Sequence, residues 1–320
     1  MITSDIYTNT QYRDDIPKEP KKVIYEDYLP SPVQKMEYSI EQTTKAHNEI
    51  AEVVDAVAKE TGKEYKNLGY FKDSGEIGNP WQHVAPECDE TFTTLGEQAN
   101  VTLLRHGEFE TTYKITMRWE LPEKRAFDEK SRSEHKLPVD IDSVVTLRKG
   151  ARYVEIETTI NNRCEDHYLQ VAFPTNIKAE YADAQGQFDV VKRPIAKPDY
   201  SLYDEIPMTE HPMNSFVDVT DGTNGVALLN TGLKAYEAAD DECNTLYLSL
   251  IRAYPLRICV TADMQNYSDW DKGSQCIGKN TFRYAFMPHK GDWEEGNVWQ
   301  ESERFNLYLT AGQIAPTGHG

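Results

Sequence analysis

The sequence predicts an all-β fold, either a large antiparallel β-sandwich or a barrel. From about residue 65 onward, apolar and polar side chains alternate along most segments, which is typical of half-buried strands. Glycine and proline separate these segments throughout. Only one segment is a good helix candidate, and many short strands with few helices favour a sandwich or a barrel.

The first 60 residues differ from the rest and are predicted to be an N-terminal arm or a remnant of a preceding segment. Residues 1–33 are polar and rich in proline. Within residues 39–60 the apolar side chains fall roughly on one helical face, and Gly62 is placed to cap a helix there. A tight turn between two strands at residues 59–63 remains the rival interpretation. The β-domain is expected to cover residues 61–320.

Five segments show the clearest strand patterns. In residues 113–121 apolar side chains occupy every second position: Tyr113, Ile115, Met117, Trp119 and Leu121. Residues 139–163 predict two strands joined near Lys149-Gly150. Further strands are expected over 225–230, 245–254 and 305–312.

The segment TFRYAFMPHKGDWEE, residues 281–295, begins as an alternating strand and is expected to break at Met287-Pro288. His289 is then placed in a corner beside Trp293. Because no metal-ligand or catalytic spacing surrounds His289, a structural role is favoured, in which its ring nitrogens satisfy carbonyl groups of the corner.

Two loops stand out by composition. Residues 193–214 form a long proline-rich loop, and loops of that length are often functional or interfacial. In residues 71–96, polar side chains crowd around one tryptophan, and the group comprises Asp73, Glu76, Asn79, Trp81 and His83. An aromatic ring beside carboxylates and an amide suits sugar recognition, whereas the alternative is an ordinary loop whose Trp plugs a core. Because Gly75, Gly78 and Pro80 interrupt pairing, residues 73–83 are expected to be an exposed loop.

The composition of the chain limits the classes of partner that it is expected to bind. The chain has 320 residues, 39% hydrophobic and 27% charged, with a formal net charge of −19. Such a charge disfavours nucleic acid and anionic membranes as partners. No signal peptide or apolar run of membrane-spanning length is visible. Five scattered cysteines without a C-x-x-C pair indicate free thiols in a reducing cytoplasm.

Catalytic and metal-binding signatures are not found. The eight histidines include no H-E-x-x-H and no H-x-D, and the chain has no G-x-S-x-G, P-loop or G-x-G-x-x-G motif. The sequence therefore predicts no catalytic residue and no metal ligand in this chain.

Four segments, in order, resemble the C-terminal β-domain of glycoside hydrolase family 38, the α-mannosidases: DSGEIGNPW (73–81), DHYLQVAFPT (166–175), GVALLNTGLKAYE (225–237) and TFRYAFMPHKGDW (281–293). The resemblance spans roughly residues 62–310. It implies a large antiparallel β-supersandwich similar to galactose mutarotase, and it agrees with a structural role for His289.

The resemblance also implies that the catalytic residues and zinc ligands lie in a different domain. Family members carry the nucleophilic aspartate, the acid/base aspartate and most or all zinc ligands in an N-terminal catalytic α/β domain, which this chain does not resemble. No cofactor is therefore expected in this chain, and zinc is expected in the missing catalytic domain. The implied partners are that domain and an α-mannoside or other carbohydrate, and a homo-oligomer remains open.

In the family, a loop at the start of the β-domain presents an aromatic residue to the sugar. The resemblance places Trp81 in that role, with Glu76 and Asn79 beside it, although the family more often has Tyr there. Asp271, in the acidic loop 269–273, is a weaker candidate for the same side.

The leading interpretation is thus the β-sandwich region of a cytoplasmic retaining α-mannosidase, inactive alone. One rival is a free-standing carbohydrate-binding or scaffold protein that uses Trp81. Another is an aldose epimerase-like enzyme, whose acid and base would be drawn from four residues: His83, His167, Glu155 and Glu157.

Overall fold

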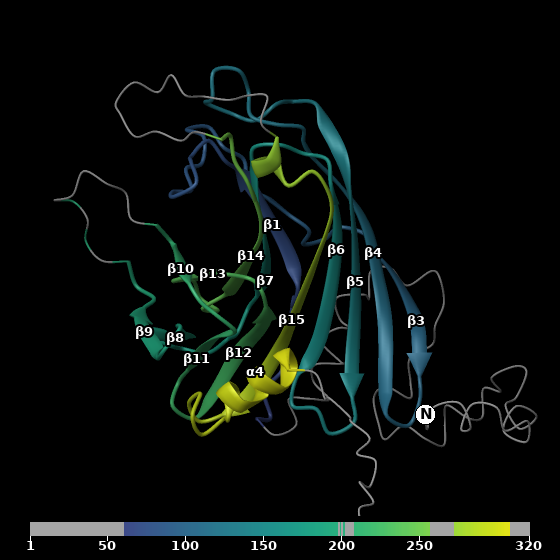
Figure 1. The fold of residues 1–320 in the computed structure, drawn as a ribbon, viewed down its shortest axis with the longest axis vertical. Coiled ribbons are helices and arrows are strands. Elements are labelled where there is room, and N and C mark those ends of the chain that lie inside the picture. The colour runs from purple at the N-terminus through teal and green to yellow at the C-terminus, as the bar shows by residue number, and fades with distance from the viewer. Residues whose placement is uncertain (1–60, 198, 200, 202–207, 257–271, 308–320) are drawn as a thin grey trace, which may run out of the picture. The chain divides into compact units, whose positions relative to one another are not determined.

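The computed structural model describes residues 61–197, 199, 201, 208–256 and 272–307. Within them the chain forms two antiparallel sheets and one α-helix (Figure 1). The helix expected over residues 39–60 and the candidate residue Asp271 lie outside the described residues. Gly62 has φ of +68°, which suits either a helix cap or a turn.

The smaller sheet has six strands in the order β10-β13-β14-β7-β1-β2. Its strands span Tyr70–Gly75 (β1), Phe92–Thr93 (β2), His167–Phe173 (β7), Glu210–Pro212 (β10), Ala235–Ala238 (β13) and Leu246–Ala253 (β14).

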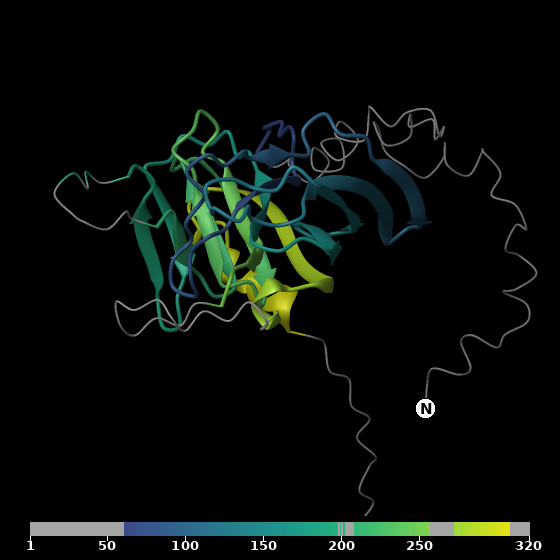
Figure 2. The ribbon, with the colours of Figure 1, turned by 90° about the horizontal axis from the view of Figure 1, so that it is seen from above.

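The larger sheet has nine strands in the order β3-β4-β5-β6-β15-β12-β11-β8-β9. Its strands span Asn100–His106 (β3), Glu110–Pro122 (β4), Lys136–Arg148 (β5), Val154–Asn162 (β6), Tyr181–Gln185 (β8), Val190–Pro194 (β9), Phe216–Thr220 (β11), Asn224–Thr231 (β12) and Gly278–Lys290 (β15). β3 and the β8–β9 hairpin lie at opposite ends of this sheet (Figure 2).

The core lies between the two sheets, so the fold is the predicted sandwich and not a barrel. Phe173 of β7 stacks on Phe286 of β15 at 5.8 Å between ring centroids and meets Tyr284 edge-on at 5.9 Å. Alternate residues of each strand point into this layer, which explains the period-2 pattern of the sequence.

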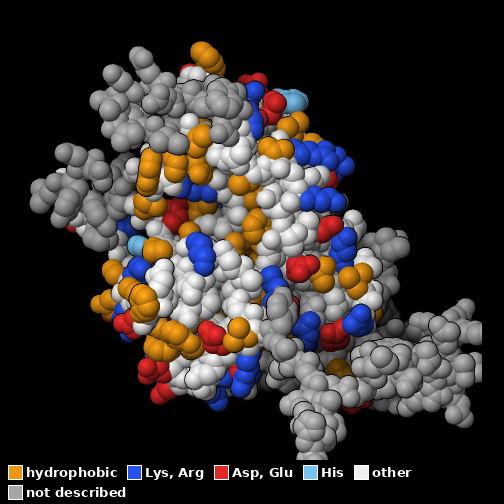
Figure 3. Space-filling model, in the orientation of Figure 1, with side chains coloured by type: hydrophobic (Ala, Val, Ile, Leu, Met, Phe, Trp, Pro, Cys, Tyr) orange, Lys and Arg blue, Asp and Glu red, His pale blue; other side chains and the backbone are white. Residues whose placement is uncertain are grey.

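The predicted strands over residues 113–121, 225–230 and 245–254 are confirmed as β4, β12 and β14. The two strands predicted within 139–163 are confirmed as β5 and β6, joined through Gly150, whose φ of +80° suits glycine. Ion pairs such as Lys114–Asp142 link β4 to β5, and side chains of both charges are mixed on the face shown in Figure 3.

The prediction that the strand breaks at Met287-Pro288 was wrong. β15 continues to Lys290, which pairs with Asn224 of β12. Pairing with β6 on the other side ends at Phe286. Pro288 therefore lies where only one neighbouring strand remains, which is the position in a sheet that tolerates the missing N–H of proline.

Helix α4, Val298–Asn306, was not predicted, and the first two residues of the strand expected over 305–312 are helical. The rest of that segment, from residue 308, lies outside the described residues. Val298 and Phe305 of α4 pack on Ala285 and Met287 of β15, on the face opposite the core. β15 is therefore covered on both faces, which explains its uninterrupted burial from Tyr284 to His289.

Four cysteines in the described part of the chain are free thiols: Cys88, Cys164, Cys243 and Cys276. Cys259 lies outside it. None of the helices in the described ranges has the length and hydrophobicity needed to cross a bilayer.

Candidate functional site

The candidate loop follows β1 at one end of the six-stranded sheet. The prediction that residues 73–83 form one exposed loop was wrong at its start, because Asp73 to Gly75 are the last residues of β1 and pair with Leu169 to His167 of β7. Gly75 pairs with His167, and its backbone N–H donates to both carboxylate oxygens of Asp89, at 3.1 and 3.0 Å.

The loop itself is a tight turn that carries Trp81 at its tip. The backbone N–H of Ile77 donates to the carbonyl of Val84 at 2.8 Å, and that of Asn79 to the carbonyl of Gln82 at 3.1 Å. The Asn79 side-chain oxygen accepts from the N–H groups of Trp81 (2.9 Å) and Gln82 (3.0 Å), which is an Asx turn. As predicted, the indole of Trp81 is accessible, with 61% of the residue exposed.

Glu76 holds the base of this turn. Its carboxylate is fully buried, and Oε1 accepts from the backbone N–H of Gly78 (2.6 Å) and Val84 (3.1 Å). A Cβ at Gly78 would lie 2.0 Å from the carbonyl oxygen of Gln82, so only glycine fits this close approach.

The second oxygen of Glu76 accepts hydrogen bonds from two side chains. Nδ1 of His83 donates to Oε2 at 2.8 Å, and Nε of Arg252 donates to the same oxygen at 2.9 Å. The other guanidinium nitrogens of Arg252 donate to the carbonyls of Asn79 and Pro80, the latter at 3.3 Å. Arg252, at the end of β14, therefore fastens both the base and the tip of the turn.

Electrostatics favour the ionised form of Glu76. Burial by itself would raise its pKa, but the hydrogen bond from His83, the charges of His83 and Arg252 and the Val84 N–H together lower the pKa below its ordinary value. The carboxylate is thus charged at neutral pH, which suits its ion pair with Arg252.

The four residues predicted to bind substrate differ in their position and exposure in the structure. Trp81 is exposed, Asn79 shapes the turn below it, and Asp271 lies outside the described residues. Direct binding of sugar by Glu76 does not fit the structure, because its carboxylate is buried and both oxygens are occupied within the protein. Arg252 was missed, since it lies 176 residues from Glu76 and no spacing signal joins them.

A second buried polar network lies beneath the loop. The carboxylate of Asp73 lies 2.6 Å from Nη2 of Arg132 and 2.5 Å from Nδ1 of His167. Nε2 of His167 lies 3.1 Å from the side-chain oxygen of Asn162. Because all these side chains are buried, the network fixes the end of β1 from which the loop departs.

These contacts also bear on the epimerase alternative. His167 is bound by Asp73 and Asn162, and His83 by Glu76. Glu155 is ion-paired with Arg283 at 2.7 Å and also with Arg148. His83, His167 and Glu155 are thus each paired with another residue of the fold, and none of these contacts pairs one of the two histidines with Glu155, as an acid and base for epimerisation would need.

His289 is enclosed by structural contacts. Its Nε2 lies 2.7 Å from Oδ1 of Asp218, and its Nδ1 lies 3.2 Å from the carbonyl of Lys290. Cβ atoms added at Gly225 and Gly296 would lie 2.3 and 2.4 Å from the imidazole ring. Buried between two glycine backbones, the ring has no open side for a substrate, which supports the structural role.

No cluster of three or more His, Cys, Asp and Glu side chains suited to a metal ion occurs in the described ranges. The residues present there do not fit the zinc site of a family catalytic domain.

Comparison with known proteins agrees with this geometry. Residues 42–255, more than half of the chain, match the profile of the glycosyl hydrolases family 38 C-terminal domain. The match begins inside the N-terminal segment and includes three of the four resembling segments, while residues 281–293 lie beyond it.

The relatives are much longer proteins. A solved α-mannosidase from Enterococcus faecalis V583 is similar with a TM-score of 0.66 and 30% identity, over 76% of this chain and 28% of that protein. A putative mannosylglycerate hydrolase of Halalkalibacterium halodurans is 25% identical over 259 residues, 75% of this chain and 27% of that protein. Alpha-mannosidase 2C1 of Mus musculus is 31% identical over 170 residues, 52% of this chain and 14% of that protein. The chain spans roughly a quarter of the length of the E. faecalis and H. halodurans proteins. It belongs to the glycosyl hydrolases family 38 C-terminal domain family.

Proposed function

We propose that this chain acts as the C-terminal β-sandwich region of a retaining α-mannosidase that hydrolyses terminal α-mannosides. It supports a catalytic α/β domain and forms one wall of the sugar pocket. The observation that carries the proposal is the exposed Trp81, presented on a turn that is fixed by buried Glu76 and by Arg252. An indole held in this way offers a rigid apolar face for stacking on a pyranose ring.

In this proposal the chain supplies no reacting group. Retaining hydrolysis needs two carboxylates about 5–5.5 Å apart, one as nucleophile and one as acid/base. The buried carboxylates near the loop, Asp73 and Glu76, are each paired with cationic groups and serve the fold. The catalytic pair and the zinc belong to the catalytic domain, and the free cysteines are in keeping with a cytoplasmic enzyme.

The decisive experiment is a chimera. The C-terminal region of the E. faecalis α-mannosidase is replaced by this chain, and hydrolysis of p-nitrophenyl α-mannoside is measured. We expect the chimera to be active, the 320-residue chain alone to be inactive with or without zinc, and Trp81→Ala to lower kcat/KM of the chimera without changing its melting temperature. Zinc-dependent turnover by the purified chain alone, or a Trp81→Ala chimera as active as its parent, would contradict the proposal.

A free-standing carbohydrate-binding protein is the second candidate, because an exposed tryptophan on a fixed turn also suits binding without catalysis. That alternative predicts that the chain alone binds α-mannosides through Trp81 and that the chimera stays inactive.

A further inference from the structure

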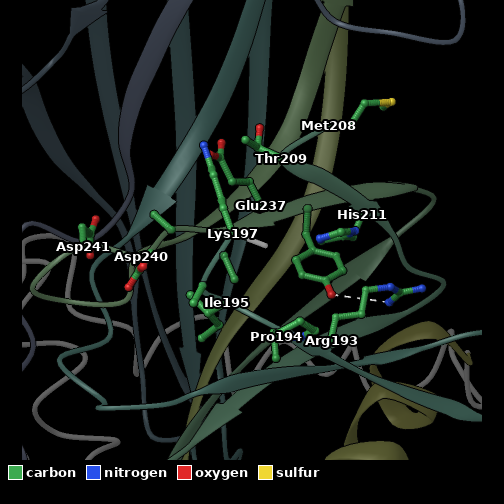
Figure 4. Close-up of a pocket in the computed structure, with 15 residues that line it drawn as sticks. Arg193, Pro194, Ile195, Lys197, Met208, Thr209, His211, Glu237, Asp240 and Asp241 are labelled. Carbon is green, nitrogen blue, oxygen red and sulfur yellow. Dashed lines mark hydrogen bonds between the residues drawn. The ribbon is translucent and has the colours of Figure 1, made fainter. Parts of the chain in front are cut away.

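A pocket of about 660 Å³ opens where the edges of the two sheets meet, away from the residues assigned above to the Trp81 turn (Figure 4). One wall is the end of β9, with Arg193 and the residues that follow it, and the other is β13, with Tyr236 and Glu237. His211 of the edge strand β10 joins them. The volume is typical of small-molecule sites in proteins.

The lining combines apolar surface with charges that nearly cancel. Ile195, Ala196 and Ala238 contribute apolar surface. Arg193 and Lys197 supply two positive charges, and three carboxylates supply negative ones: Glu237, Asp240 and Asp241. Burial and nearby Arg193 lower the pKa of His211, so it is neutral at pH 7. Because the positive and negative charges of the lining nearly cancel, the pocket favours neither a polyanion nor a polycation.

Hydrogen-bonding capacity is left over in the pocket. Nη1 of Arg193 lies 3.5 Å from the hydroxyl of Tyr236, and no described carboxylate forms an ion pair with this guanidinium (Figure 4). Oε2 of Glu237 accepts from Nε2 of Gln170 at 3.1 Å and lies 3.5 Å from Nζ of Lys72. A guanidinium has five N–H donors and a carboxylate has about four lone-pair sites, so Arg193 and Glu237 can each form further hydrogen bonds beside the apolar surface of the pocket.

The pocket is joined to the Trp81 turn by one row of side chains. Gln170 donates to the hydroxyl of Tyr168 at 3.2 Å as well as to Glu237. The ring of Tyr168 lies 4.7 Å from that of His83, which binds Glu76. The two places share a supporting row in the six-stranded sheet but no lining residue.

We propose that this pocket is a second, non-catalytic carbohydrate site, which takes a neutral sugar unit of one or two pyranose rings. Its hydroxyls would bind Arg193 and Glu237, and its C–H face would lie on the alanine and isoleucine side chains. Residues 195–197 and 208–209, within the segment predicted to be one long proline-rich loop, line the pocket. The prediction of a loop over 193–214 was wrong at both ends, because Arg193 and Pro194 belong to β9 and Glu210–Pro212 form β10. The site goes beyond the role proposed for Trp81 and does not depend on it.

The test is direct binding of methyl α-D-mannopyranoside and α-1,2-mannobiose to the 320-residue chain, by calorimetry and ligand-observed NMR. We expect millimolar binding that Arg193→Met weakens by about tenfold, which is about 1.4 kcal/mol, because the variant removes hydrogen bonds from a charged group to the sugar. Lys192→Met, at the neighbouring exposed position outside the pocket, should leave the affinity unchanged, and so should Trp81→Ala.

A second variant protects the test against misfolding. Ala196→Trp fills the pocket from an exposed position and should abolish binding with an unchanged melting temperature. Absence of binding by the wild-type chain, or binding that survives Arg193→Met and Ala196→Trp, would overturn the proposal. Loss of binding in Trp81→Ala alone would place the sugar at the turn, which overturns the second site while supporting the first.

Discussion

Nε2 of His289 lies 2.7 Å from Oδ1 of Asp218, and both side chains are completely buried. Burial alone would lower the pKa of His289, but the hydrogen bond and charge of Asp218, with the Lys290 carbonyl, raise it above its ordinary value of 6.5. The pair joins β11 to β15 beneath the turn that leads into α4.

The first prediction is a loss of stability at alkaline pH. Because the folded-state pKa of His289 is raised, its stabilising contribution is fully present below about pH 6.5 and is lost as pH rises through the folded-state pKa. Melting temperatures between pH 6 and 9 should therefore fall in the wild-type chain and change less in Asp218→Asn. His135→Gln, at an exposed histidine, is the control and should keep the wild-type profile. Parallel profiles for the wild type and Asp218→Asn would show that the pair does not titrate in this range.

The second prediction concerns the glycine that encloses His289. Gly225→Ala places a Cβ 2.3 Å from Cε1 of the imidazole, so the variant should lose about 3 kcal/mol of unfolding free energy through overpacking. Gly107→Ala is the matched control, because its added Cβ meets nothing closer than 4.0 Å, and its stability should change by less than about 1 kcal/mol. Urea denaturation measures both, and equal midpoints would mean that the ring moves freely.

The third prediction separates two tryptophans. Trp293 is half-buried and packs on Phe216 and Trp299, with ring centroids 6.3 and 6.4 Å away, whereas Trp81 is exposed. Trp293→Ala should cost about 3 kcal/mol of unfolding free energy, and Trp81→Ala less than about 0.5 kcal/mol. A Trp293→Ala variant that melts like the wild-type chain would refute its structural role.

The fourth prediction tests the anchor of the Trp81 turn. Glu76→Gln removes the charge partner of Arg252, which should cost about 3 kcal/mol and increase amide hydrogen exchange over residues 77–84. Glu87→Gln, at an exposed carboxylate of the same connection, is the control and should change neither measurement. Unchanged exchange in Glu76→Gln would mean that the backbone alone holds the turn.

The fifth prediction is the acid dependence of the same anchor. Since the pKa of Glu76 is lowered in the folded state, its contribution is complete above the ordinary value of about 4.5 and is lost as pH falls through the folded-state pKa. The difference in melting temperature between the wild type and Glu76→Gln should therefore shrink below pH 4.5. A difference that stays constant from pH 7 to 3 would exclude an ionic contribution of Glu76.

The sequence by itself determined the strands, because alternation of apolar and polar residues follows directly from one face being buried. It also favoured a structural role for His289 and an exposed position for Trp81. His289 lacks any catalytic spacing, and Trp81 follows Gly78 and Pro80 in a segment that cannot pair regularly. It failed at β15, where burial on both faces removes the alternation, and at α4, whose nine residues were too few to show a helical period against a strand-like pattern.

Only the tertiary structure decided which side chains meet. Glu76 looked like a sugar ligand in a polar loop, yet β14 brings Arg252 from 176 residues away to bind it, and pairing of β1 with β7 buries Asp73 against His167. The pocket at Arg193 and Glu237 is likewise a product of two sheet edges that meet in space. Local pattern reports which face of an element is buried, whereas long-range strand order determines what that face is buried against.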